Sequence, residues 1–167
     1  YLEDIKPVIK EKQEFFRKLA KRFYPNNASG ITVYPNEGEN QQRYTIEAKI
    51  ESDNSDGINN VKIFCYDMTM LFKGHGHNVK FSFHDSRLFD GIDEKHKAEI
   101  FKVVNELFNG TDYQYIATVN QNQLNEVKSI LTEQEYEEII EQNTILTLTD
   151  EDDSEKLLGV KVDVGYE

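Results

Sequence analysis

The sequence of 167 residues contains no tryptophan and only one cysteine, Cys65. A single cysteine excludes an intramolecular disulfide framework and favours a reducing, cytoplasmic compartment. No stretch approaches the roughly 18 consecutive apolar residues that a membrane-spanning helix needs, so we expect no membrane partner. We expect no secretory signal, and because the chain begins at Tyr1 we expect it to be part of a longer protein. The 10 phenylalanines and 9 tyrosines supply enough apolar volume for the core of one domain.

The common motifs of catalysis are also missing. The sequence has no phosphate-binding GxxxxGK[ST] loop and no GxSxG, HExxH or CxxC motif. In P-loop nucleotide hydrolases, a lysine-bearing phosphate loop neutralises charge in the transition state. If the chain takes part in nucleotide chemistry, another segment or another chain must therefore supply that loop.

Positive charge is scarce and unevenly spread. The formal net charge is −12, from 19 Lys/Arg and 31 Asp/Glu. Residues 1–24 carry seven basic and four acidic side chains, whereas residues 25–167 carry twelve and twenty-seven. An acidic body repels phosphate backbones, so we do not expect residues 25–167 alone to bind DNA.

The basic segment 1–24 predicts a helix. Its apolar side chains recur in alternating steps of three and four residues, with Lys12 in one of the seam positions and an early interruption at Pro7. Two interpretations remain open: the end of a coiled-coil arm, or an amphipathic helix that packs on its own domain. Residues 25–30 then form a stop and turn, which predicts a division between 1–24 and 25–167.

The remaining sequence predicts an α/β fold. Residues 31–34 and 43–51 form an antiparallel hairpin, and residues 58–72 form a largely apolar, buried helix. Strands and helices then alternate, which indicates a mixed, partly parallel sheet covered by helices. We expect strands at 79–83, 113–119, 144–149 and 160–164, helices at 93–108, 123–131 and 134–140, and an acidic loop at 150–155.

The most informative block is residues 79–93, VKFSFHDSRLFDGID. Its strand delivers Asp85 to the carboxyl end of a sheet, where ligands bind in open α/β folds. Asp85 is the candidate ligand for Mg²⁺. Asp90 and Asp93 follow closely and could face the same site. The alternative is that they cap the next helix, and for Asp93 the two roles are compatible. His84 is a second candidate for site chemistry, or else a hydrogen-bonded structural histidine.

Two further segments fit an anion site. Residues 52–60, SDNSDGINN, open a helix at which free amides could bind an anion, with Ser55 adding a hydroxyl and Gly57 allowing close approach. Such stretches are also ordinary helix caps. Asn120 ends the predicted strand 113–119 and is either a ligand for water or phosphate or a turn residue.

Three other reactive side chains are interpreted as structural. Cys65 lies in the apolar helix 58–72 without an evident basic partner, so we expect it in the core. His75 and His77 lie in a glycine-rich stretch that is too flexible for a preformed metal site, and we expect a linker there.

The order of these blocks resembles the C-terminal half of an ABC-type ATPase head of the SMC/RecN kind. The segments IFCYDMTML, HDSRLFDGIDEKH and YQYIATVN resemble the C-terminal domain of an uncharacterised family of bacterial SMC-like ATPases, some encoded beside defence systems. The resemblance implies ATP and Mg²⁺ as ligands, an N-terminal lobe of the same protein as partner, and a dimer of heads. It implies a signature-like role for Ser55 and Gly57, a Walker B-like role for Asp85, a D-loop role for Asp93 and a switch role for Asn120.

Two positions depart from that pattern. Ser86 stands where such ATPases usually carry a catalytic glutamate, and Asn120 stands where they usually carry histidine. His84 and Asp90 are the candidates to act in their place. The sequence therefore leaves two functions open: a lobe of a composite ATPase with a role in DNA maintenance or defence, which contacts DNA only through the intact assembly, or a non-catalytic interaction module with a degenerate nucleotide site.

Overall fold

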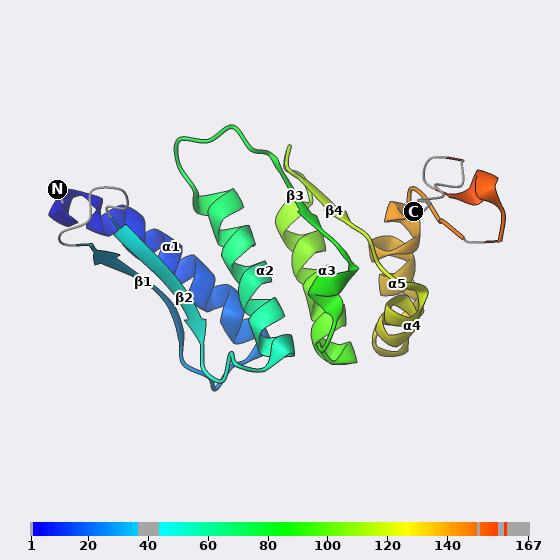
Figure 1. Ribbon diagram of the computed structural model, residues 1–167, viewed down its shortest axis with the longest axis horizontal. Coiled ribbons are helices and arrows are strands. Elements are labelled where there is room, and N and C mark those ends of the chain that lie inside the picture. The colour runs from blue at the N-terminus through cyan, green and yellow to red at the C-terminus, as the bar shows by residue number, and fades with distance from the viewer. Residues whose placement is uncertain (1, 37–43, 150, 157–158, 160–167) are drawn as a thin grey trace, which may run out of the picture.

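The computed structural model describes residues 2–36, 44–149, 151–156 and 159 (Figure 1). Its regular elements, in chain order, are α1 (Leu2–Phe23), β1 (Ser29–Pro35), β2 (Tyr44–Ile50), α2 (Asp56–Lys73), β3 (Phe81–His84), η1 (Ser86–Phe89), α3 (Glu94–Phe108), β4 (Gln114–Ala117), α4 (Gln121–Ile130), α5 (Glu133–Ile139), η2 (Glu141–Asn143) and η3 (Asp153–Glu155). None of these helices combines the length and hydropathy needed to cross a bilayer.

Two separate pairs of strands confirm the predicted α/β class. Strands β1 and β2 are antiparallel, with Ser29 opposite Ile50 and Pro35 opposite Tyr44. Strands β3 and β4 are parallel, with Phe81 opposite Gln114, and helix α3 lies between them in the chain. The predicted N-terminal hairpin thus forms a small sheet of its own, apart from the parallel pair.

Helix α1 runs without a break through Pro7, where the sequence predicted an interruption. The proline removes one hydrogen bond, to the carbonyl of residue 3, and a loss so close to the helix start disturbs few turns. The C-terminal half of the helix is buried in the domain core through Phe16, Leu19 and Phe23. This half is therefore an amphipathic helix that packs on its own domain. The division at residue 24 stays a prediction.

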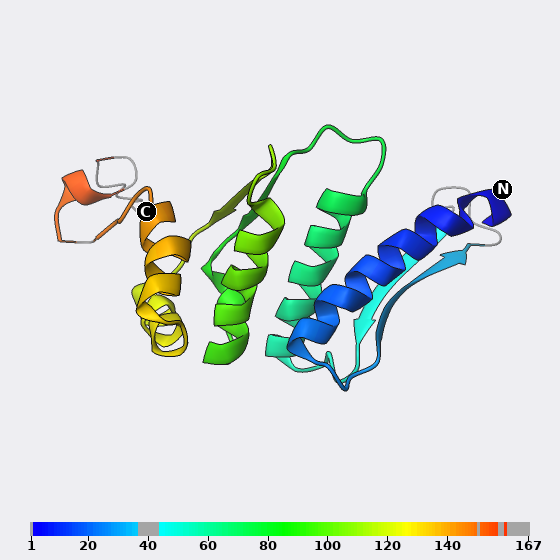
Figure 2. The ribbon, with the colours of Figure 1, turned by 180° about the vertical axis from the view of Figure 1, so that it is seen from behind.

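Helix α2 is the centre of the core. It lies between α1 and α3, as Figures 1 and 2 show from opposite sides. Phe64, Cys65 and Met68 have no exposed surface and belong to one hydrophobic cluster that reaches from α1 to α5. The prediction of a buried helix with Cys65 in the core is confirmed.

The parallel pair has one uncovered apolar face. Side chains alternate along its strands, so His84 and Tyr115 point into the domain while their neighbours point outward. Phe81 and Phe83 are 54% and 53% exposed, and Ile116 is 37% exposed. Three large apolar side chains of a parallel sheet therefore face solvent.

The predicted strand at 144–149 is wrong. These residues have no regular structure, and Ile145 is 94% exposed. A strand needs a neighbour for its backbone hydrogen bonds, and within the described part of the chain no strand pairs with this segment. The acidic stretch that follows includes the short turn η3, and the predicted strand at 160–164 lies outside the described residues.

Candidate functional site

The parallel register brings two of the predicted site residues to one edge. His84 lies opposite Ala117, and the Thr118 amide donates to the His84 carbonyl oxygen at 3.1 Å. Asp85 follows the end of β3 directly, and Asn120 begins helix α4 just after β4. Both side chains therefore leave the carboxyl edge of the same two-stranded sheet.

Asp85 has the features of a single metal ligand. It is exposed, and its Oδ1 accepts a hydrogen bond from the Arg87 amide at 3.0 Å, which fixes the carboxylate at the start of η1. Its Oδ2 takes part in no hydrogen bond found among the described residues. Over the same residues, no group of three or more His, Cys, Asp or Glu side chains could hold a metal. A magnesium ion here would need most of its oxygen ligands from a nucleotide, from water or from another segment, which is how Mg²⁺ is commonly bound.

The start of helix α2 is joined to the segment that follows Asp85. A Cβ atom added to Gly57 would lie 2.3 Å from the Gly91 carbonyl oxygen, so the two backbones are in direct contact. Asn60 Nδ2 donates to the Asp90 carbonyl oxygen at 2.9 Å and to that of Arg87 at 3.2 Å. The two predicted site segments, 52–60 and 85–93, are thus held together by one backbone contact and by the Asn60 side chain.

Ser55 and Gly57 occupy different positions at this helix start. Ser55 is the exposed N-cap residue of α2, and its side chain makes no capping hydrogen bond. Its hydroxyl is therefore not committed to the helix. Gly57 is buried against Gly91, so packing alone requires a glycine there.

Gln123 connects the same loops and was missed in the sequence. Its side chain is buried, and its Oε1 accepts from the Asn120 amide at 3.1 Å. Its Nε2 donates to the Ser86 carbonyl oxygen and to Asp90 Oδ1, both at 3.1 Å. The spacing of Asn120 and Gln123 is that of a capping box, which could have indicated the first contact. The contacts with Ser86 and Asp90 could not be predicted, because they cross 37 and 33 residues of sequence.

Asp93 caps helix α3, as one of the two interpretations expected. Its Oδ1 accepts from the His96 amide at 2.9 Å, and its Oδ2 lies 2.6 Å from Nδ1 of the His96 ring. Burial by itself would raise the pKa of Asp93, but the His96 amide and ring outweigh it and lower that pKa overall. Asp90, by contrast, does not cap α3 with its side chain, which accepts from Gln123 instead.

His84 lies on the inner face of the sheet and directly precedes Asp85 in the chain. Its ring is 7% exposed, with Nδ1 3.0 Å from the Tyr115 hydroxyl and Nε2 3.0 Å from Asp67 Oδ2. Burial, and secondarily the charge of Asp67, raise the pKa of Tyr115, so its hydroxyl stays protonated. Both ring nitrogens are engaged, which is the arrangement of a hydrogen-bonded structural histidine.

The remaining reactive side chains lie outside this edge. Burial raises the pKa of the Cys65 thiol, which makes it an unreactive core residue. His75 and His77 are exposed in the link between α2 and β3, where His77 Nε2 lies 3.1 Å from the Met70 carbonyl oxygen.

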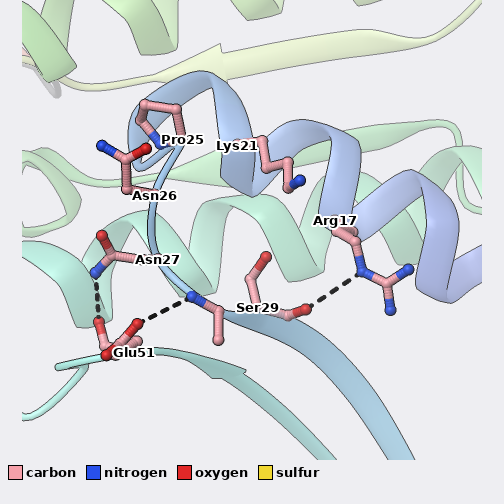
Figure 3. Close-up of a pocket in the computed structure, with 8 residues that line it drawn as sticks. Arg17, Lys21, Pro25, Asn26, Asn27, Ser29 and Glu51 are labelled. Atoms are coloured by element: carbon pink, nitrogen blue, oxygen red, sulfur yellow. Dashed lines mark hydrogen bonds between the residues drawn. The ribbon is translucent and has the colours of Figure 1, made fainter.

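A surface hollow of about 420 Å³ lies elsewhere, between the end of α1 and the turn before β1. Figure 3 shows Arg17 and Lys21 reaching toward it from the helix, with residues 25–29 and Glu51 completing its wall. The Arg17 guanidinium donates to the Ser29 carbonyl oxygen, and Glu51 accepts from the Ala28 amide. None of the predicted site residues lines this hollow.

The fold is similar to that of a solved SMC head. The structure described as "Crystal structure of the SmcHead bound to the C-winged helix domain of ScpA" matches with a TM-score of 0.53 at 10% sequence identity. The match covers 72% of this chain and 38% of that chain, so the chain corresponds to less than half of the neighbour. At this identity the likeness shows the fold alone, and it supports the expected SMC-like architecture.

The family is established by sequence. Residues 19–162 match the family described as "Uncharacterised protein conserved in bacteria (DUF2326)", and the chain belongs to that family. No curated protein matches the chain.

Proposed function

We propose that this chain is the C-terminal lobe of an SMC/RecN-like ATPase head and that it binds ATP and Mg²⁺ at a composite site. An N-terminal lobe of the same protein would supply the phosphate loop and the rest of the sheet. The chain corresponds to only 38% of the SMC head that it matches. The activity proposed here is therefore that of the whole protein and not of this chain alone.

The uncovered face of β3 and β4 is the observation that carries the proposal. Parallel sheets are found almost only where both faces are covered, because their strands are joined through packed helices. Here one face is packed on the core, while Phe81, Phe83 and Ile116 are exposed on the other. A two-stranded parallel sheet with such a face is a fragment of a larger sheet. The N-terminal lobe is the partner that would extend and cover it.

The site residues take separate roles in this proposal. Asp85 contributes a carboxylate to Mg²⁺, and Ser55 offers its uncommitted hydroxyl to the phosphate of a nucleotide held by the opposite head. Gly57 keeps the start of α2 against Gly91, and Asn120 orients a water or a phosphate oxygen. When bound, ATP with Mg²⁺ supplies the phosphoryl group and the metal charge that stabilises its transfer.

Two further residues position these groups. His84 is held by Tyr115 and Asp67 and fixes the end of β3, and with it Asp85. Asp93 fixes the start of α3. In this account the intact protein is a cytoplasmic dimer of heads, and DNA contacts belong to the assembly and not to this acidic chain.

A non-catalytic interaction module is the second candidate. It is favoured by Ser86 and Asn120, because neither a hydroxyl nor an amide is an effective general base at neutral pH. The carbonyl of Ser86 is moreover held by Gln123, which fixes this residue in its turn. In this case the intact protein would bind nucleotide weakly or not at all.

Nucleotide binding and turnover by the full-length protein separate the two candidates. We expect the full-length protein to bind ATP in a magnesium-dependent manner and the 167-residue chain alone to show no turnover, since it has no phosphate loop. Absence of nucleotide binding by the folded full-length protein would favour the interaction module.

A further inference from the structure

His96 bridges the end of helix α1 and the cap of helix α3. Its Nε2 lies 2.8 Å from the Phe23 carbonyl oxygen, 73 residues away in sequence, and its Nδ1 lies 2.6 Å from Asp93 Oδ2. The ring is also 4.7 Å from the Tyr24 ring, measured between centroids. One side chain thus contacts both the last residue of α1 and the aspartate that caps the start of α3.

The two contacts of the ring require a particular charge state. A carbonyl oxygen and a carboxylate oxygen are both acceptors, so each nitrogen of His96 must donate. A neutral imidazole carries one N–H and would leave one acceptor facing a lone pair. Only the imidazolium ion satisfies both, and both bonds are then assisted by its charge.

The charged groups around His96 are compatible with a cation. Asp93 supplies the opposing charge, and Phe23 contributes the carbonyl at the negative end of the α1 dipole. One turn further along α3, Glu99 is already paired with Arg22 of α1, with 2.6 Å between Oε1 and Nε. Burial raises the pKa of Tyr24 to about 12, with a smaller contribution from Asp93, so this neighbour stays neutral.

Arg22 adds a second link between the same two helices. Its guanidinium donates to both Glu99 and Glu106 of α3, and the Arg22 contact lowers the pKa of Glu106. The end of α1 is therefore attached to α3 along several turns, and His96 extends this attachment to the first turn.

We propose that His96 is a positioning residue: as an imidazolium ion it fixes the end of α1 relative to Asp93. A shift of α1 is then transmitted to the start of α3. This rests on the proposed function only in treating Asp93 as a site residue, because the bridge itself is a property of the chain alone. Its function in the intact protein would be to couple helix α1 to the nucleotide site.

The charge state is tested by ¹⁵N NMR of the histidine rings in the 167-residue chain at neutral pH. We expect both His96 nitrogens to be protonated. Asp93→Asn should remove the proton from Nδ1, which then accepts from the new amide, while Nε2 keeps its own. The matched control Glu94→Gln removes a charge from the same helix turn without contacting the ring and should leave both protons. A singly protonated His96 in the unchanged chain would overturn the proposal.

The coupling is tested by amide hydrogen exchange in His96→Phe, which keeps an aromatic ring beside Phe23 and Tyr24 but removes both donors. We expect exchange to rise about tenfold in the last turn of α1 and in the first turn of α3 together, which is the effect of losing a charged hydrogen bond. His75→Phe in the exposed link should change neither. An increase in exchange confined to α3 would contradict the coupling, because His96 would then affect only the cap of its own helix. Neither measurement involves nucleotide, so both results remain valid if the proposed ATP site is wrong. The ¹⁵N NMR result for the unchanged chain also remains valid if His96→Phe does not fold.

Discussion

Gly57 of helix α2 lies directly against Gly91, so close that a Cβ atom on Gly57 would come within 2.3 Å of the Gly91 carbonyl oxygen. Gly91 has a φ of +69°, a conformation that favours glycine. The contact joins the loop that opens α2 to the segment between Asp85 and Asp93. The two glycines therefore set the spacing of the two halves of the candidate site.

Gly57→Ala should destabilise the fold by about 1–3 kcal/mol, because the added methyl group meets backbone atoms that cannot rotate away. The free energy of unfolding in urea measures this. Gly30→Ala is the matched control, since no atom lies within 4 Å of a Cβ added there and its φ is not positive. An equal effect of the two substitutions would contradict the close contact.

Gln123→Glu should destabilise the protein more than Gln123→Ala at neutral pH. The new carboxylate would keep the contact with the Asn120 amide but would face the Asp90 carboxylate and the Ser86 carbonyl oxygen in place of a donor. We expect Gln123→Glu to lower the free energy of unfolding by about 1–3 kcal/mol more than Gln123→Ala, the cost of unmatched buried polar groups. This difference should become smaller below about pH 4, where carboxyl groups take up protons. Urea titrations at several pH values test this, and a penalty independent of pH would be the contrary result.

Glu135→Gln should weaken the dependence of the free energy of unfolding on pH under acidic conditions. Hydrogen bonds from Lys102 and from the Thr132 amide and hydroxyl lower the pKa of Glu135 from 4.5 to about 2. A lowered pKa means that the stabilisation is complete above about pH 4.5 and is lost as the pH falls toward 2. The variant should lose less stability than the unchanged chain across this window. Glu137→Gln on the same helix serves as control and should keep the original slope.

Substitutions on the uncovered sheet face should scarcely affect the chain itself. Phe81→Thr and Phe83→Thr remove side chains that are more than half exposed, so each should change the free energy of unfolding by less than about 0.5–1 kcal/mol. Phe89→Thr, at a site with no exposure, should cost about 3–5 kcal/mol. A comparable loss from Phe83→Thr would show that this face is already packed and would remove the main support for a missing lobe.

The sequence predicted the elements that have strong local signals. Helices α2 and α3 and the β1–β2 hairpin follow from apolar periodicity and turn residues, and the capping role of Asp93 follows from its place before a helix. Segment 144–149 shows that local propensity alone does not form a strand. Its β-branched and apolar residues favour a strand, but no strand among the described residues pairs with it.

The contacts within the site were less predictable. That Asp85 and Asn120 share an edge follows from the alternation of strands and helices. The contacts of Gln123 with Asp90 and of His96 with Phe23 join residues far apart in sequence, and no local pattern specifies such pairs. His84 was a candidate for chemistry because of its neighbour Asp85, whereas its ring is buried and contacts Tyr115 and Asp67.

Whether Asp85 holds Mg²⁺ at a composite nucleotide site is decided by the ATP affinity of the full-length protein. Affinity is measured with and without Mg²⁺ for the natural protein and for Asp85→Asn, together with the melting temperature. Asparagine keeps the shape and the hydrogen bond from the Arg87 amide but removes the charge. We expect an unchanged melting temperature and a large loss of the magnesium-dependent part of the ATP affinity. A folded Asp85→Asn protein whose ATP affinity responds to Mg²⁺ as the natural protein does would contradict this role of Asp85.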